Sequence, residues 1–247
     1  MCGTSLQAAC HSLDSVVQAA QPGDVLRLNP AAAAYRLSCV SSPGHGYVLQ
    51  SLTITALNNG SADRPTIGCE APAADAATTA SRCALRLDNV TLIDVDLQVD
   101  NCHVTILGSR LVESTVYTTR TCRSLRMRVT RSNWTFAGHL PCGRMAPQSN
   151  VSGEVCRQTP LINRLQCVSV DVTLDRVRLV LGSLVIQSRY STHVYVVQSQ
   201  FTGDSDKPGS QFLGGLRLTF STIGANITIV NCVFSNQVST GLSTTDI

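Results

Sequence analysis

A pattern of eight residues, with apolar residues at its first, third and eighth positions, recurs along this chain at nearly regular intervals. Its copies begin at Val104, Met127, Val172, Val194 and Leu216. Successive starts lie 23, 45, 22 and 22 residues apart. We interpret the interval of 45 as two repeats, with the skipped copy in the Pro-, Gly- and Cys-rich stretch 137–163. A near-constant period indicates similar units that stack on one another.

The segments that carry this pattern predict β-strands. Residues 93–99 and 168–174 alternate apolar and other side chains, which is the period of a strand with one buried face. Strands that recur about every 22 residues predict an all-β chain folded as a β-solenoid. The alternative is a β-sandwich, whose strands also alternate but need no fixed period. Copies that begin out of phase at Val90 and Ile227 are assigned to a second face of each coil.

The start of the chain predicts a short helix instead of strands. Residues 11–20 have apolar residues at the spacing of one helix face. A Pro-Gly-Asp turn follows at 22–24, and a first strand is predicted at 25–28. The residues of the apolar helix face are Leu13, Val16, Val17 and Ala20.

These patterns divide the chain into two parts. We expect an N-terminal cap in residues 1–46 and β-coils in residues 47–247. Loop insertions are expected near 58–83 and 137–163. The helix would cover the open apolar end of the coil stack.

Several segments resemble those of right-handed parallel β-helix proteins. They are Cys2-Gly3-Thr4-Ser5, Cys10-x-Ser12-Leu13, Ala20-x-Pro22-Gly23-Asp24, Val197–Gly203 and Ile229–Asn236. The early segments are similar to a capping helix and first strand, and the later ones to coils of pectin-lyase-like and polymorphic-outer-membrane-protein-like chains. The resemblance implies a right-handed parallel β-helix with an N-terminal capping helix. This fold includes polysaccharide lyases, hydrolases, esterases, tailspikes and adhesins, so it does not select one activity.

Eleven cysteines indicate disulfide bonds, because no C-x-x-C pair with metal-site spacing is present. The sequence leaves the connectivity open. We expect a clamp at the N-terminal end and two local bridges in loops. The candidates are Cys2 and Cys10, Cys69 and Cys83, and Cys142 and Cys156.

Five Asn-x-Ser/Thr sequons support an extracellular or cell-surface location, with β-strand propensity as the competing explanation for them. The first 20 residues contain no signal peptide, so we expect a fragment of a longer extracellular protein. The candidate glycosylation sites are Asn59, Asn89, Asn133, Asn150 and Asn226.

Composition excludes several classes of partner. Charged residues make up 14% of the chain and the net charge is +3, which gives no general basis for nucleic-acid binding. The longest apolar run is 31–35, far too short for a transmembrane helix. No phosphate-binding glycine loop is present, and we expect no cofactor.

Two sets of charged residues could carry chemistry. Asp94 and Asp96 alternate on one predicted strand and could bind Ca²⁺ or act as acid and base. The competing interpretation is a solvated strand face. Residues 101–131 contain six arginines against Glu113, and guanidinium groups suit the anionic groups of acidic glycans. Within this stretch Arg126 and Arg128 share a strand face.

The expected function is a non-catalytic extracellular or cell-surface domain that acts as a scaffold, adhesion or glycan-recognition module. Its expected partners are an acidic glycan or another surface protein. The alternative is a polysaccharide lyase or glycoside hydrolase that acts on acidic polysaccharide. In that case Asp94, Asp96, Arg126 and Arg128 would be catalytic, and the two aspartates would hold Ca²⁺.

Overall fold

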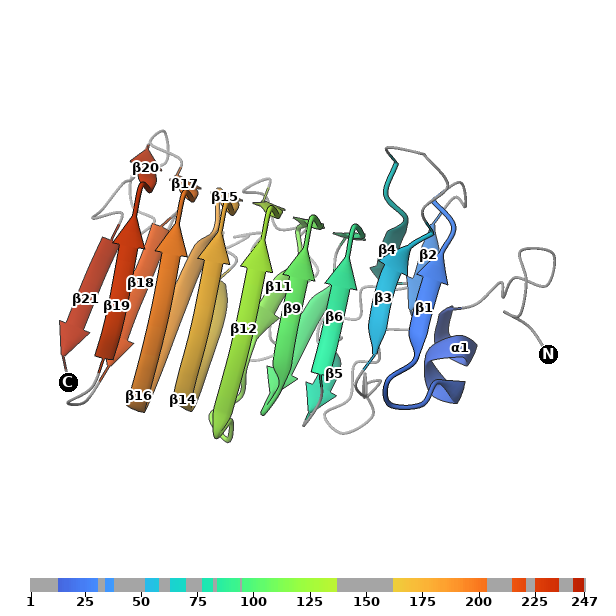
Figure 1. The fold of residues 1–247 in the computed structure, drawn as a ribbon, viewed down its shortest axis with the longest axis horizontal. Coiled ribbons are helices and arrows are strands. Elements are labelled where there is room, and N and C mark those ends of the chain that lie inside the picture. Colours follow the sequence, from blue (N-terminus) through green and yellow to red (C-terminus); the bar gives the residue numbers. More distant parts are fainter. Residues whose placement is uncertain are drawn as a thin grey trace, which may run out of the picture.

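A computed structural model of the chain contains one helix and 21 strands in the residues that it describes. The strands form three sheets in which every recorded pairing is parallel, and they lie side by side along the long axis (Figure 1). The described residues are 13–30, 34–37, 52–57, 63–69, 77–81, 84–93, 95–136, 162–203, 215–220, 225–235 and 242–246.

The largest sheet has ten strands. In spatial order they are β1 (Val25–Leu28), β3 (Thr53–Ala56), β6 (Ala84–Asp88), β9 (His103–Leu107), β12 (Ser124–Thr130), β14 (Ile162–Asp175), β16 (Ser183–Val197), β18 (Gly215–Phe220) and β21 (Leu242–Asp246), with β19 (Ala225–Val230) also paired to β16.

The two other sheets have eight and three strands. The eight are β2 (Tyr35–Leu37), β4 (Thr66–Cys69), β7 (Thr91–Ile93), β10 (Arg110–Val112), β13 (Asn133–Thr135), β15 (Arg178–Val180), β17 (Gln200–Thr202) and β20 (Val233–Ser235). The three are β5 (Ala77–Ser81), β8 (Asp96–Asp100) and β11 (Thr115–Tyr117).

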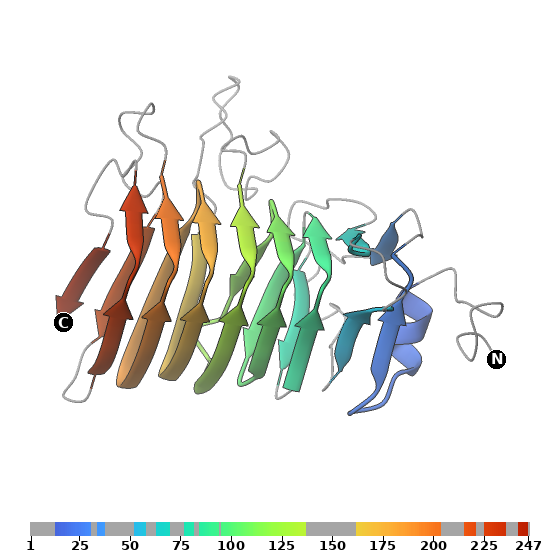
Figure 2. The same ribbon diagram turned by 45° about the horizontal axis from the view of Figure 1, so that its top comes forward.

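Between β3 and β12 the chain passes through the ten-, eight- and three-stranded sheets in a fixed order. From β6 it passes through β7 and β8 and returns as β9, which pairs with β6. We call one such circuit a coil. In Figure 2 each strand of the ten-stranded sheet from β6 to β16 leads into a short strand of the eight-stranded sheet. The predicted all-β class and long parallel sheets are therefore confirmed.

The apolar pattern marks one column of the ten-stranded sheet. Val104 pairs with Met127, Met127 with Val172, and Val172 with Val194. All four side chains are at most 2% exposed, because they point into the interior.

The interval of 45 residues was interpreted wrongly. Met127 and Val172 are direct partners, so the interval is one coil with a long insertion and contains no skipped repeat. The copy at Leu216 was also misplaced: it pairs with Leu184, while Ile227 continues the Val194 column. The spacing could not separate these cases, because an insertion can equal one repeat in length.

The strand predicted at 93–99 is two strands. β7 ends at Ile93 and β8 begins at Asp96, so the alternating residues belong to two sheets. Strands β4 and β5 lie within the insertion predicted near 58–83.

The interior is filled by apolar side chains from all three sheets. On the eight-stranded sheet Leu111, Trp134 and Leu179 are successive partners, and each is 1% exposed. Phe201 stacks on Phe234 with ring centroids 5.0 Å apart. Large residues in register thus form a continuous core along the stack.

The helix α1 (Leu13–Ala19) lies beside β2 at the end of the stack that begins with β1 (Figure 1). Leu13 and Val17 are one helical turn apart and are 2% and 6% exposed. Both belong to the continuous apolar core. No helix in the described part of the chain is long and apolar enough to cross a membrane.

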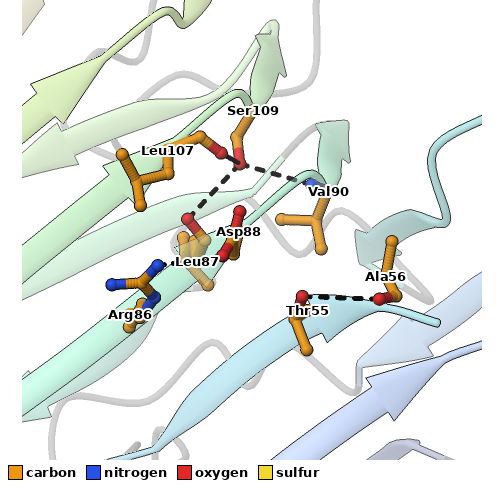
Figure 3. A network of polar contacts seen from close by, with 8 residues as sticks. All are labelled: Thr55, Ala56, Arg86, Leu87, Asp88, Val90, Leu107 and Ser109. Atoms are coloured by element: carbon orange, nitrogen blue, oxygen red, sulfur yellow. Dashed lines mark hydrogen bonds and ion pairs between the residues drawn. The ribbon is translucent and has the colours of Figure 1, made fainter. Parts of the chain in front are cut away.

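The passage from the ten-stranded to the eight-stranded sheet, here called the first corner, repeats in each coil. At this corner the Ser109 hydroxyl donates to the carbonyl oxygen of Leu107 at 2.8 Å and accepts from the Val90 N–H at 3.3 Å (Figure 3). Ser132 accepts from the Ser109 N–H, and Ser199 accepts from the Val177 N–H. A corner hydroxyl therefore satisfies a buried backbone donor of the preceding coil.

One disulfide joins neighbouring coils on both sides of the long insertion. Cys122 and Cys167 are bonded and have Cα atoms 4.7 Å apart. Disulfides are typical of oxidising compartments.

Candidate functional site

The two predicted arginines lie on the outward face of the ten-stranded sheet. Arg126 and Arg128 belong to β12, and both are exposed. Arg126 Nε donates to Asp171 Oδ2 of β14 at 3.0 Å, with 58% and 42% of the side chains exposed. An exposed ion pair of this kind contributes about 0–1 kcal/mol to stability.

The predicted aspartates do not share that face. Asp94 lies outside the described residues, and Asp96 begins β8 of the three-stranded sheet. Since β12 belongs to the ten-stranded sheet, Asp96 and the two arginines come from different sheets. Among the described residues no group of three or more His, Cys, Asp or Glu side chains could hold a metal ion.

Asp100, which ends β8, is a buried structural carboxylate. Its side chain is 7% exposed and accepts hydrogen bonds from the Thr119 N–H at 2.8 Å and the Thr119 hydroxyl at 3.0 Å. Gln98 Nε2 donates to it at 2.7 Å. These neutral donors compensate the carboxylate for lost water, so Asp100 joins two coils and does not contribute to a charged surface.

Four arginines gather where the ten-stranded and eight-stranded sheets meet. Arg131 and Arg176 occupy the first corner in successive coils, and Arg110 and Arg178 begin β10 and β15. Asn133 pairs with both Arg110 and Arg178, so the two arginines lie two strands apart. All four arginines are exposed. We call Arg110, Arg131, Arg176 and Arg178 the arginine edge.

The two corner arginines have left-handed backbones. Their φ angles are 50° at Arg131 and 53° at Arg176. This conformation costs a residue with a Cβ roughly 1–2 kcal/mol, and Gly and Asn tolerate it best. Gly108 occupies the same corner one coil earlier, where a Cβ atom would lie 2.5 Å from Asn89 Oδ1. Coil stacking therefore explains Gly108, but not the arginines.

The carboxylate of Asp175 interacts electrostatically with both corner arginines. Arg176 donates to both of its carboxylate oxygens, at 3.0 and 2.8 Å. This hydrogen bonding is the main cause of the lowered pKa of Asp175; burial opposes it, and the charges of Arg176 and Arg131 add to it. The same pair raises the pKa of Arg176. Both guanidinium groups therefore act on a single carboxylate.

The sequence window of 101–131 contained only half of the arginine edge. Arg176 and Arg178 were missed because the insertion separates them from Arg131 in sequence. The signal was nevertheless present: Arg131 and Arg176 are both the fifth residue of the eight-residue pattern. Aligning the copies would have placed them on neighbouring coils.

Three candidate sequons lie in the described residues, and all have exposed asparagines: Asn89, Asn133 and Asn226. In the strands, Asn133 and Thr135, and Asn226 and Thr228, share a face because side chains alternate. Asn59 and Asn150 lie outside the described residues.

The predicted disulfide candidates fall on residues whose side chains the structure does not describe. Cys2, Cys10, Cys83, Cys142 and Cys156 lie outside the described residues, and of Cys69 only the backbone, at the end of β4, is described. The bond between Cys122 and Cys167 was not predicted. Their separation of 45 equals that of Met127 and Val172, and this equality was the available signal.

Comparison of the chain with models of protein families, with curated proteins and with solved structures found no match.

Proposed function

We propose that this chain is a non-catalytic domain of an extracellular or cell-surface protein, folded as a right-handed parallel β-helix of about 22 residues per coil. Its outward faces act as a recognition scaffold for a glycan or another surface protein. The helix α1 serves as the N-terminal cap, which is supported by the burial of Leu13 and Val17 against the core.

The observation that carries this proposal is the state of the carboxylates. Asp88, Asp171 and Asp175 are each in an ion pair with an arginine, and Asp100 is buried among neutral donors. A general acid or base must direct a carboxyl group at the substrate. These four instead bond to neighbouring side chains, which suits a rigid surface that binds without reacting.

The compartment is proposed from two observations. The disulfide between Cys122 and Cys167 needs an oxidising environment to form. The asparagines of two sequons away from Arg110 and Arg178 are exposed, so we propose that Asn89 and Asn226 carry glycans in a secretory host, while Asn133, which lies between these arginines, stays unmodified.

A substrate panel tests the non-catalytic proposal. Purified protein is incubated with pectin, alginate and polygalacturonate, with Ca²⁺ or with chelator, while unsaturated uronate is followed by ultraviolet absorbance and new reducing ends are assayed. We expect no product in any arm, together with retention of the protein on glycan arrays or surface-protein preparations. Chelator-sensitive release of unsaturated products would replace this proposal with the lyase alternative.

A further inference from the structure

The first corner has a left-handed backbone in six coils, and its residues fall into two kinds. Asn and Gly tolerate this conformation, and they occupy half of the positions. Arginine and glutamine have no such advantage, yet they occupy the other half, and arginine does so in two successive coils. When a residue departs from the local preference of the backbone, a role for its side chain is the hypothesis to test. The six corner residues are Asn89, Gly108, Arg131, Arg176, Gln198 and Asn231.

We propose that the arginine edge binds a linear sulfated polysaccharide, whose sulfate groups are held by Arg110, Arg131, Arg176 and Arg178. The proposal rests on the proposed function of the chain as a recognition scaffold, and it names the ligand class and the residues.

The spacing of the arginines suits a polymer that lies along the stack. Neighbouring parallel strands are about 4.8 Å apart, so Arg131 and Arg176 are about that far apart at their backbones. Arg110 and Arg178 are two strands apart, or about 10 Å, with Asn133 between them. The edge therefore presents cations in two parallel rows, and a linear polymer can reach both.

The charges are incompletely compensated within the described residues. The Asp175 carboxylate receives two hydrogen bonds from Arg176, and Arg131 acts on it through its charge alone. Arg131 and Arg176 carry like charges on neighbouring coils, and like charges repel each other even in water. An anion that bridges Arg131 and Arg176 removes this repulsion and gains charge-assisted hydrogen bonds from both guanidinium groups.

Sulfate fits this edge better than an uncharged sugar or a single carboxylate. A sulfate ester stays ionised at every pH at which a protein of this kind is folded, and three of its oxygens can accept hydrogen bonds. One sulfate can therefore contact Arg131 and Arg176 together, while Asp175 keeps its own bonds to Arg176.

The test compares matched polymers and matched variants. The protein is produced in the bacterial periplasm, where the Cys122–Cys167 bond can form and Asn133 carries no glycan. Binding to dextran sulfate, dextran and polygalacturonate is measured by biolayer interferometry at several salt concentrations. The test variant is Arg131→Gln with Arg176→Gln, since Gln198 occupies the same corner position. The control is Arg27→Gln with Arg164→Gln, which removes two exposed charges from other sheet positions.

We expect the wild type to bind dextran sulfate, not to bind dextran, and to bind polygalacturonate at least tenfold more weakly. The test variant should lose roughly tenfold in affinity for each arginine removed, the size of one charge-assisted hydrogen bond. The slope of log affinity against log salt should fall by about one for each arginine. The control variant should retain wild-type affinity and slope.

Stability provides a second readout that separates binding from misfolding. Arg131→Asn should unfold at the wild-type temperature or above it, because Asn tolerates the left-handed backbone better, and should still lose affinity for dextran sulfate.

Three results would overturn the inference: no binding to dextran sulfate, equal binding to polygalacturonate, or equal loss in the test and control variants. Any of these leaves the scaffold proposal standing if the protein still binds other glycans or a surface protein. Depolymerisation of any polymer would instead overturn the non-catalytic proposal, while the variants would still decide the role of the arginines.

Discussion

Two regions of the molecule turn from one sheet to the next in different ways. In the first region, residues 84–136, the three-stranded and ten-stranded sheets are separate: β8 ends at Asp100 and β9 begins at His103. In the second region, residues 162–203, β14 and β16 run for 14 and 15 residues through the equivalent bend. The first half of β14 lies beside β11, where the Thr118 N–H donates to the Arg164 carbonyl.

Side chains at the bend explain the difference. In the first region Asp100 accepts the Thr119 N–H, and Asn101 Oδ1 accepts the N–H groups of Arg123 and Ser124. These acceptors take backbone donors away from the strand ladder, so the strand ends. In the second region a register shift between Cys167 and Ser169 bends the strand without ending it. The chemistry of the bend, and not the repeat length, decides whether two sheets remain separate.

The largest expected effect comes from breaking the covalent link between the two regions. Cys122→Ser with Cys167→Ser opens a loop of 45 residues, and we expect a loss of about 4 kcal/mol in the free energy of unfolding. The measurement is a urea titration of the purified variant. Cys232→Ser is the control, because Cys232 is outside this bond. A double variant with the wild-type midpoint would contradict the assignment of this bond as a clamp.

The polar bend of the first region is tested by Asp100→Ala. This change leaves the partly buried Thr119 N–H without its acceptor, so we expect a loss of about 1–3 kcal/mol. Hydrogen exchange should accelerate at the Thr119 amide. Asp100→Asn keeps one carbonyl acceptor and should lose less. If alanine and asparagine behave alike, the carboxylate does not hold this bend.

Removing a polar side chain at the bend of the second region should cost less stability than at the bend of the first. The Ser188 hydroxyl lies 2.8 Å from the Ser191 carbonyl and 3.1 Å from the Val168 carbonyl. Because strand pairing continues on both sides, we expect Ser188→Ala to cost only about 1 kcal/mol. Ser191→Ala keeps the carbonyl and should be neutral. A cost above that of Asp100→Ala would reverse the comparison between the regions.

The smallest effect is a pH dependence at the first corner of the second region. The folded-state pKa of Asp175 is lowered below its ordinary value of 3.8, chiefly by the hydrogen bonds from Arg176. Its stabilising contribution is therefore fully present above that value and is lost as the pH falls through the lower, folded-state pKa. Thermal unfolding of Asp175→Asn should show a weaker decline in this acid range than the wild type. Identical acid profiles would assign the decline to other groups.

Periodicity predicted the part of the fold that depends on backbone pairing and burial. The column through Val104, Met127 and Val172 follows from the apolar pattern, because only inward residues must be apolar. It could not separate β7 from β8, because the alternation of apolar residues continues without a break through the two residues between these strands. Periodicity also could not show whether the interval from Met127 to Val172 is two coils or one coil with an insertion.

The candidate site was less predictable, because pairing between coils brings together residues that are distant in sequence. Arg126 and Arg128 were placed correctly on one face, but Asp171, the partner of Arg126, is 45 residues away in sequence. The arginine edge emerges only when residues of successive coils are aligned by position. A count of charges along the sequence separates Arg110 and Arg131 from Arg176 and Arg178, because the insertion lies between the two pairs.

The shared hydroxyl at the first corner also sets an order of events during synthesis. The Val90 N–H is satisfied by Ser109, and the Ser109 N–H is satisfied by Ser132 of the next coil. A ribosome releases these coils from the N-terminal side, so each finished corner depends on a serine that is synthesised later. At these corners the newest coil to leave the ribosome therefore has an N–H that only water can satisfy, until the next coil emerges and supplies its serine.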